Sequence, residues 1–178
     1  LHKVEDLVRV INRWQPRPGR LLVIPFGKLQ ERIALVTNPK LRTLLYRRMM
    51  VRISCEIARK IGAMALITGE SIGQVASQTI ENLAVVDSVS SLPILRPLIG
   101  FDKEEIIQDA HRLGTYEISI RPSVDCCTLF ADRHPVLRAN PALLKTEENS
   151  FPVQEWVQER VLEAFQSTGS GTEAILDI

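Results

Sequence analysis

The sequence predicts an α/β fold in which a parallel sheet is flanked by helices. Short apolar runs, such as residues 63–68, alternate along the chain with longer amphipathic segments, such as residues 41–61. A strand that is covered on both faces is expected to be apolar along its whole length. Strands separated by helices pair in parallel through right-handed crossovers. The alternation therefore predicts a parallel sheet, and 178 residues are enough for one full core.

The composition is that of an ordinary globular protein, with 45% hydrophobic and 24% charged residues. No apolar run approaches the roughly 20 residues that cross a bilayer, and the first residues lack a signal-peptide pattern, so we expect a cytoplasmic protein. Three cysteines, two of them adjacent, fit a reducing compartment and lack the spacing of a zinc site. The net charge of +1 means that RNA binding would need local basic patches or another domain.

The first predicted elements are a helix and a buried strand. Apolar residues recur at helical spacing from Val4 to Ile11, and this helix is expected to stop before Pro16. Residues 21–24 are all apolar and are followed by Pro25, which predicts a short buried strand.

A long amphipathic helix is predicted next. Asn38 can cap its start, and Pro39 suits the first helical position. Gly62 can end the helix in the left-handed conformation. Between these residues, apolar side chains recur at every fourth position and form a stripe: Leu41, Leu45, Met49, Ile53, Ile57 and Ile61.

The later elements follow the same logic. Residues 63–68 are predicted to form a strand that is buried on both faces. A capping box at residues 102–105 opens a helix that should end near Gly114. The last clear helix is predicted from about Val153 to Phe165, and the apolar end at 174–176 could add a strand or dock in trans.

The stretch that follows the strand 63–68 has features of a nucleotide site. Gly69 and Gly73 allow a ligand to approach the backbone closely. Gln74 and Gln78 can read a base edge with their amide groups, and they would share a face if the segment were helical. The spacing fits neither the dinucleotide fingerprint nor the phosphate loop that ends in Gly-Lys-Ser. An ordinary strand-to-helix connection explains the spacing about equally well.

Two other groups of residues could take part in chemistry. Arg47 and Arg48 lie in the middle of the long helix, where a solvated face is the usual outcome, but one of them could bind a phosphate or ribose. Cys126 and Cys127 lie in a loop, where a thiol could be a nucleophile or sulfur carrier. An inert, half-buried pair is the alternative. Cys55, on the long helix, is expected to be a packing residue.

Taken together, several strings of this chain resemble the tRNA uridine 4-sulfurtransferase family. The most specific is Gly69-Glu-Ser-Ile-Gly-Gln-Val-Ala-Ser-Gln78, and the resemblance covers most of the chain. The other matching stretches are residues 47–50, 79–83, 95–99, 114–122 and 125–127.

The resemblance implies a PP-loop ATP pyrophosphatase domain, which has a Rossmann-like parallel sheet with flanking helices, as in adenine nucleotide alpha hydrolases. The family uses ATP and Mg²⁺ to adenylate the C4 oxygen of tRNA uridine 8, and then replaces that oxygen with sulfur from a cysteine desulfurase. Carried over to this chain, the resemblance implies that Arg47, Gly69 and Gln78 contact ATP. It also implies that Cys126 is the thiol of sulfur transfer, and no metal ligand is expected among the residues of this chain. A homodimer is plausible.

The chain departs from the family pattern in one respect. The Ser-Gly-Gly-x-Asp-Ser phosphate loop is absent from these residues, as are the THUMP, ferredoxin-like and rhodanese-like domains. Residues 1–178 are therefore expected to be a partial catalytic domain that is inactive alone. Two alternatives are a nucleotide- or partner-binding module without turnover, and another PP-loop ligase or amidotransferase.

Overall fold

The computed structural model describes residues 1–122, 130, 132, 135–166 and 175–177. The chain divides into two compact units. The first unit comprises Leu1–Ile24, Phe101–Val124 and Glu163–Ile178, and the second comprises Pro25–Gly100 and Asp125–Leu162.

The first unit holds the described elements nearest the two chain ends, together with a short helical insertion. Lys3 donates to the carbonyl oxygen of Arg121 at 2.8 Å, and Asp6 pairs with Arg121 at 2.7 Å. The indole of Trp14 is 60% exposed and donates to the carbonyl of Leu113 at 3.2 Å. These contacts tie the first helix to the insertion. The elements are α1 (His2–Asn12), β1 (Arg20–Leu22), α5 (Lys103–Leu113), α6 (Tyr116–Ser119) and β4 (Ile175–Asp177).

The helix ends of this unit confirm the sequence predictions. Helix α1 ends at Asn12, before Pro16. In α5, the backbone N–H of Glu105 donates to the Asp102 carboxylate at 2.9 Å, and the N–H of Asp102 donates to the Glu105 carboxylate at 2.8 Å, which is the predicted capping box. Gly114 ends α5 with a φ of 76°, a backbone conformation that favours glycine.

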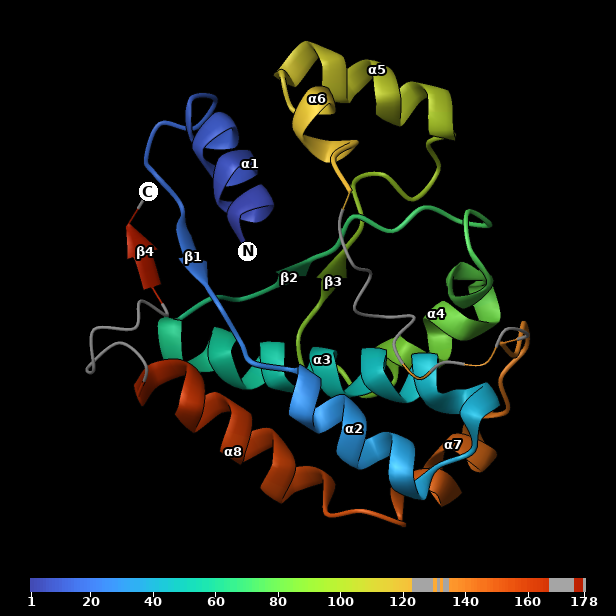
Figure 1. Ribbon diagram of the computed structural model, residues 1–178. Helices are drawn as coiled ribbons and strands as arrows, with labels where there is room; N and C mark the ends of the chain where they lie inside the picture. The colour runs from blue at the N-terminus through green and yellow to red at the C-terminus, as the bar shows by residue number, and fades with distance from the viewer. Residues whose placement is uncertain (123–129, 131, 133–134, 167–174, 178) are drawn as a thin grey trace. The chain divides into compact units, whose positions relative to one another are not determined.

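Strand β1 differs from the predicted strand at 21–24. It pairs antiparallel with β4 in the register Leu21 to Leu176, and the two strands lie side by side in Figure 1. The side chains of Leu21 and Leu22 are half-buried rather than buried. The apolar C-terminal end thus forms a strand, one of the two roles expected for it.

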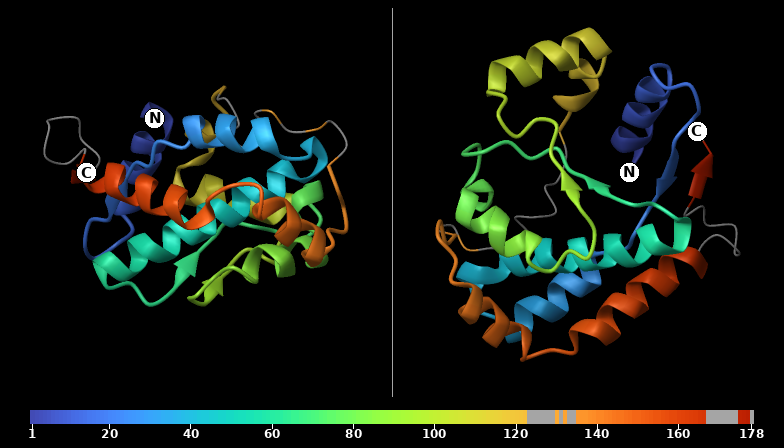
Figure 2. Two further views of the ribbon diagram at one scale, coloured as in Figure 1. Left: turned by 90° about the horizontal axis from the view of Figure 1, so that it is seen from below. Right: turned by 180° about the vertical axis from the view of Figure 1, so that it is seen from behind.

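The second unit is built around a long helix and a pair of short parallel strands. Helix α3 lies between the strand pair and helix α2 (Figure 1 and Figure 2). Residues 153–162 of the last helix belong to this unit. Its elements are α2 (Gly27–Val36), η1 (Pro39–Leu41), α3 (Arg42–Ile61), β2 (Leu66–Ile67), η2 (Ala76–Gln78), α4 (Ile80–Asp87), β3 (Ile94–Leu95), α7 (Pro141–Glu148) and α8 (Val153–Gln166).

Helix α3 forms the core of the second unit much as the sequence predicts. The side chain of Asn38 accepts from the N–H of Lys40 at 3.1 Å and caps the short turn η1, from which α3 continues. Gly62 ends α3 with a φ of 75°. Ile61, the last predicted member of the stripe, is 64% exposed, because it lies in the final turn beyond the packed part of the helix. The other five members of the stripe are buried: Leu41, Leu45, Met49, Ile53 and Ile57.

Strands β2 and β3 form the parallel pair that the alternation of elements predicts. Leu66 is in register with Ile94 and Ile67 with Leu95, and the N–H of Thr68 donates to the carbonyl of Leu95 at 3.0 Å. Helix α3 packs against β2. Ile67 is nevertheless 72% exposed and Leu95 is 51% exposed. The prediction of burial on both faces is therefore wrong for these two residues: α3 packs against β2, but the side chains of Ile67 and Leu95 remain in contact with solvent.

Helix α2, which the sequence did not predict, is joined to α8 by an aromatic and ionic cluster. The rings of Phe151 and Trp156 stack with centroids 5.0 Å apart, and the guanidinium of Arg32 lies 4.2 Å from the Trp156 ring centroid. Arg32 also pairs with Glu159 at 2.6 Å. Trp156 is only 7% exposed, so the cluster shields the ring from water.

A buried ionic cluster joins α3 to α7. Glu148 accepts from Arg48 at 2.7 and 2.8 Å and from Arg52 at 2.6 and 2.9 Å. Arg48 also donates to the carbonyl of Val85 at 2.5 Å and to the hydroxyl of Ser88 at 2.9 Å. Burial raises the pKa of the Glu148 carboxyl, but the hydrogen bonds and charges of the two arginines outweigh this effect and lower the pKa to about 2.

Among the described residues, none of the helices combines the length and the apolar character that a membrane crossing requires.

Candidate functional site

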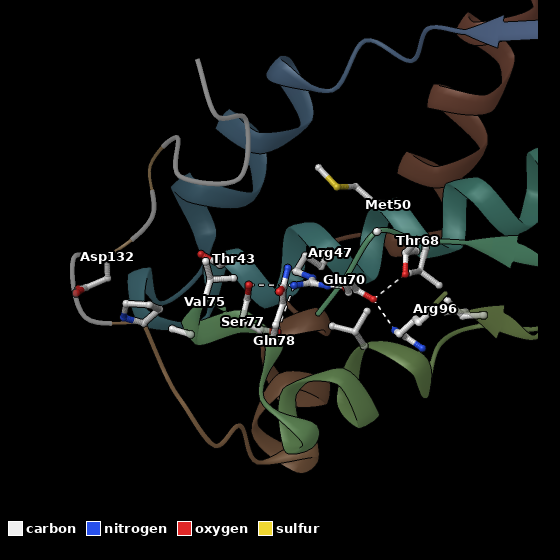
Figure 3. Close-up of a pocket in the computed structure, with 16 residues that line it drawn as sticks. Thr43, Arg47, Met50, Thr68, Glu70, Val75, Ser77, Gln78, Arg96 and Asp132 are labelled. Atoms are coloured by element: carbon white, nitrogen blue, oxygen red, sulfur yellow. Dashed lines mark hydrogen bonds and ion pairs between the residues drawn. The ribbon is translucent and has the colours of Figure 1, made fainter. Parts of the chain in front are cut away.

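A cavity of about 870 Å³ opens in the second unit, where β2 and β3 end. Thr68 follows β2 and Arg96 follows β3, and both residues line the cavity (Figure 3). The carboxyl ends of parallel strands are the usual place for ligands in open α/β sheets. The cavity also has the size of a small-molecule site. Its position agrees with the expectation that the stretch after the strand 63–68 forms a binding site.

The structure separates the two arginines at the centre of α3. Arg47 faces the cavity with a side chain that is 12% exposed, whereas Arg48 turns to the buried Glu148 cluster. The alternative that the pair forms a solvated face is therefore wrong. Arg47 donates to the hydroxyl of Ser77 at 2.9 Å and to its carbonyl at 3.2 Å, and it forms an ion pair with Glu70 (Figure 3).

Gly69 and Gln78 line the same cavity as Arg47. A Cβ atom built on Gly69 would meet no protein atom within 4 Å, so a side chain here would occupy open space rather than clash with the protein. The side-chain oxygen of Gln78 accepts from the N–H of Ser71 at 3.4 Å, which leaves its amino group as a donor for a ligand. Three of the four residues to which the resemblance assigns a role thus meet at one cavity.

Gln74 does not share a helical face with Gln78. The helical turn η2 covers only Ala76–Gln78, and Gln74 lies before it in a turn that includes Gly73 with a φ of 77°. Gly73 donates its N–H to the carbonyl of Gln78 at 3.1 Å and so closes this turn. The short turn replaces the longer helix that the spacing of the two glutamines allowed.

Glu70 and Arg96 are site residues that the sequence reasoning missed. Glu70 accepts from Thr68 at 2.8 Å and from Arg96 at 2.6 Å, in addition to its pair with Arg47. Arg96 in turn pairs with Asp87 at 3.0 and 2.5 Å. The available signal was a charged residue just beyond each of two short apolar runs, Glu70 three positions after β2 and Arg96 directly after β3, because parallel pairing brings both to the same edge.

Cys126 lies outside the described residues, as do Asp125 and Cys127. Asp132 and Pro135, which follow it in the sequence, line the cavity. Five residues lie between Cys126 and Asp132 in the sequence.

Cys55 is a packing residue, as predicted. It is 3% exposed, and its sulfur lies 3.4 Å from the hydroxyl of Ser90. Burial raises the pKa of the Cys55 thiol, but hydrogen bonds with Ser90, Ser91 and Leu92 lower it by more than burial raises it. A thiol buried to this extent is closed to a large substrate.

Asn82 holds the cavity wall to α4. Its side chain is fully buried and donates to the carbonyls of Ala76 at 2.9 Å and Val136 at 2.8 Å, and it accepts from the N–H of Ala139 at 3.0 Å. Both N–H groups of the Asn82 amide therefore donate hydrogen bonds, and its oxygen accepts one.

We expect the change Asn82→Ala to lower the free energy of unfolding by about 2–3 kcal/mol, because it leaves one buried and two partly buried backbone groups without this partner. Urea denaturation measures this loss. Asn149→Ala, at an exposed helix end, is the matched control and should change stability by less than about 0.5 kcal/mol. Equal effects of the two changes would contradict the role given to Asn82.

Comparisons with known proteins give a consistent result. The family model of the thiamine biosynthesis protein (ThiI) matches residues 1–153. The chain is 48% identical over 153 residues to a probable tRNA sulfurtransferase of Thermus thermophilus, covering 86% of this chain and 37% of that protein. It is 47% identical over 164 residues to a probable tRNA sulfurtransferase of Caldanaerobacter subterraneus, covering 90% of this chain and 43% of that protein. The chain thus spans about two fifths of the length of these relatives.

A solved structure is similar as well. The crystal structure of a 4-thiouridine synthetase–RNA complex with bound ATP superposes with a TM-score of 0.84 at 44% identity, covering 93% of this chain and 42% of that one. This likeness confirms the predicted α/β fold class, in which helices flank a parallel sheet.

Proposed function

Because the chain belongs to the thiamine biosynthesis protein (ThiI) family, we propose that it is part of the catalytic domain of an ATP-dependent tRNA sulfurtransferase. The proposed reaction replaces the C4 oxygen of tRNA uridine 8 with sulfur and gives 4-thiouridine. The observation on which the proposal depends is the meeting of Arg47, Gly69 and Gln78 at one cavity, in a chain that is 44% identical to a 4-thiouridine synthetase with bound ATP.

The chemistry of the cavity suits an adenine nucleotide. Apolar side chains of Val75, Val86 and Ile94 can pack against a flat base. Both Gly69, above which there is free space, and Gln78, with its amino group, line this cavity. Arg47 offers a planar guanidinium of the kind that binds ribose and phosphate oxygens.

Mg²⁺ is part of this proposal. Mg²⁺ is usually held by nucleotide phosphates with one or two carboxylates rather than by a protein cage. Within the described ranges, no group of three or more acidic, histidine or cysteine side chains gathers. The phosphate oxygens of the nucleotide would then supply most of the Mg²⁺ ligands that do not come from the protein, as in other nucleotide-dependent enzymes.

The proposed reaction has two bond exchanges. The C4 oxygen of uridine attacks the α-phosphorus of ATP and pyrophosphate leaves, which makes that oxygen a good leaving group. The terminal sulfur of a persulfide then attacks C4, and AMP leaves with the original oxygen. The Cys126 thiol next attacks the donor-side sulfur of the resulting disulfide, which releases 4-thiouridine and leaves a disulfide between Cys126 and the donor cysteine. A cellular thiol must reduce that disulfide before the next turnover.

The partners follow from the same chemistry. A cysteine desulfurase is the proposed source of the persulfide, and tRNA is the proposed substrate. The near-neutral net charge of +1 supports the idea that other domains of the full-length protein provide much of the RNA affinity. A homodimer and a cytoplasmic location, where tRNA is found, complete the proposal.

The function can be tested in cells that lack 4-thiouridine. Production of the full-length protein should restore the nucleoside, measured by mass spectrometry of digested tRNA. A tRNA with cytidine at position 8 should stay unmodified and is the substrate control. Production of a folded protein without 4-thiouridine, or formation of an aminated nucleoside instead, would contradict the proposal and favour a binding module or another PP-loop ligase.

We expect Gly69→Ala to weaken ATP binding by about tenfold or more, because its methyl group would project into space that the nucleotide needs. The fold should be unaffected, since this methyl group meets no protein atom. Calorimetry with the full-length protein measures the affinity, and thermal unfolding measures stability. Gly27→Ala is the matched control, because its Cβ also meets open space but it does not line the cavity. Unchanged ATP affinity for Gly69→Ala would argue against this position of the base.

A further inference from the structure

Four charged side chains of alternating sign form a chain of ion pairs, and three of them line the cavity. Arg47 pairs with Glu70, Glu70 with Arg96, and Arg96 with Asp87. They come from α3, from the turn after β2, from the end of β3 and from the end of α4. The ion pairs thus join four segments of the second unit around the edge where the strands end. Figure 3 shows three of these side chains, those of Arg47, Glu70 and Arg96.

Glu70 is the central member of this chain. Glu70 is 8% exposed, and both of its carboxylate oxygens have hydrogen-bond or ion-pair partners. One oxygen pairs with Arg47, and the other accepts from Arg96 at 2.6 Å and from Thr68 at 2.8 Å. A carboxylate held at this many points has little freedom to turn, so it can fix the position of the groups that it binds.

Asp87 anchors the chain from outside the cavity. It contacts Arg96 with both carboxylate oxygens, its side chain is 40% exposed, and it is not among the described residues that line the cavity. A bidentate carboxylate fixes the plane of a guanidinium. Arg96 is therefore oriented by Asp87 on one side and presents its Nε to Glu70 on the other.

The charges of the four side chains sum to zero, and this balance depends on Glu70. Without its carboxylate, the guanidinium groups of Arg47 and Arg96 would face each other in a wall where their side chains are only 12% and 11% exposed. Buried like charges repel strongly because water does not screen them. Arg47 would then leave its position beside Ser77.

We propose that Glu70 and Arg96 are positioning residues of the nucleotide site, which hold the guanidinium of Arg47 ready for the ligand. The inference rests on the proposed function, since the ligand is taken to be ATP. Arg47 reaches the site already fixed by Glu70 and Ser77, so binding does not have to order a long, flexible side chain. The affinity then depends on the placement of this donor rather than on an excess of positive charge in the wall.

The test measures ATP affinity by calorimetry, and kcat and KM for ATP, in the full-length protein. Glu70→Gln should weaken ATP binding about tenfold, the loss expected for one charge-assisted hydrogen bond. Asp87→Asn, whose side chain does not line the cavity, should weaken it about threefold through Arg96. In both variants KM should rise more than kcat falls. Glu81→Gln is the matched control. Glu81 lies on the same helix as Asp87 and forms an exposed ion pair with Arg138, so this change should leave the ATP affinity unchanged.

A double-mutant cycle separates positioning from a merely structural role. If Glu70 acts through Arg47, then Arg47→Ala combined with Glu70→Gln should bind ATP no more weakly than Arg47→Ala alone. Additive losses would overturn the inference, as would Glu70→Gln and Asp87→Asn proteins that bind ATP as tightly as the unchanged protein. If the unchanged protein does not bind ATP at all, the proposed function fails and the inference fails with it. Thermal unfolding of each variant shows whether a loss reflects misfolding, and Asp87→Asn, at a partly exposed position, provides the test if Glu70→Gln does not fold.

Discussion

Replacing Glu148 by alanine is expected to lower the free energy of unfolding by about 3–5 kcal/mol. The change removes the only acceptor shared by the guanidinium groups of Arg48 and Arg52 among their described contacts, and both side chains are largely buried. Two buried positive charges would then lie side by side without a counter-charge. Urea unfolding followed by circular dichroism measures the loss. Glu155→Ala, at an exposed position of α8, is the control and should change stability by less than about 0.5 kcal/mol.

The same carboxylate makes stability depend on pH. The pKa of Glu148 falls from 4.5 in the unfolded chain to about 2 in the folded protein. A group whose folded pKa is lowered stabilises the fold fully above the unfolded pKa, and this contribution, about 3 kcal/mol, is lost as the pH falls from about 4.5 to about 2. Glu148→Ala should therefore show a weaker loss of stability over this acid range than the unchanged protein. Parallel curves for the two proteins would show that Glu148 is not the responsible group.

Replacing Cys126 by serine is expected to abolish multiple turnover of 4-thiouridine formation, a loss of about a hundredfold or more. A serine hydroxyl cannot attack the sulfur–sulfur bond that joins the thiolated uridine to its donor, so this bond would persist after the oxygen has left. Adenylation should continue, because it does not use the thiol. Mass spectrometry of digested tRNA measures the product, and release of pyrophosphate in the presence of tRNA measures the first step.

Cys127→Ser is the matched control for this prediction, since it changes the adjacent thiol in the same segment. We expect it to keep most of the activity. Full activity of Cys126→Ser would remove this thiol from the mechanism, and the opposite pattern in the two variants would move the role to Cys127.

The sequence predicted the parts of the fold whose signals are local. The stripe of α3 repeats along a single helix, the capping box at Asp102 involves two residues three positions apart, and Gly62 and Gly114 end helices with their own backbone conformation. Each signal is complete within a few turns of chain. The helices α1, α3, α5 and α8 were therefore predicted with nearly correct ends.

Elements without such local signals were missed. Helix α2 begins after Phe26, which makes no side-chain cap, and it is held by the distant Trp156 and Glu159. The partner of Arg48 lies 100 positions further along the chain, so a reading of α3 alone suggested a solvated arginine. The exposure of Ile67 likewise depends on which helices cover the sheet, and a run of apolar letters does not contain that information.

For the candidate site, the sequence predicted which residues meet but not what holds them. Arg47, Gly69 and Gln78 line one cavity, as the resemblance to the family implied. Their contact with ATP remains a proposal, and Cys126 lies outside the described residues. The ion pairs of Glu70 and Arg96 depend on two strands lying side by side, because 26 positions separate the two residues in the sequence.

The placement of the two tryptophans gives each compact unit its own optical reporter. Trp14 is mostly in water and belongs to the first unit, whereas Trp156 is enclosed by Phe151 and Arg32 in the second. A shielded indole emits at shorter wavelength than a hydrated one. A variant that keeps only Trp156 can therefore follow the melting of the second unit through a shift of its emission to longer wavelength, whereas Trp14, which is already hydrated, would follow the first unit through its emission intensity.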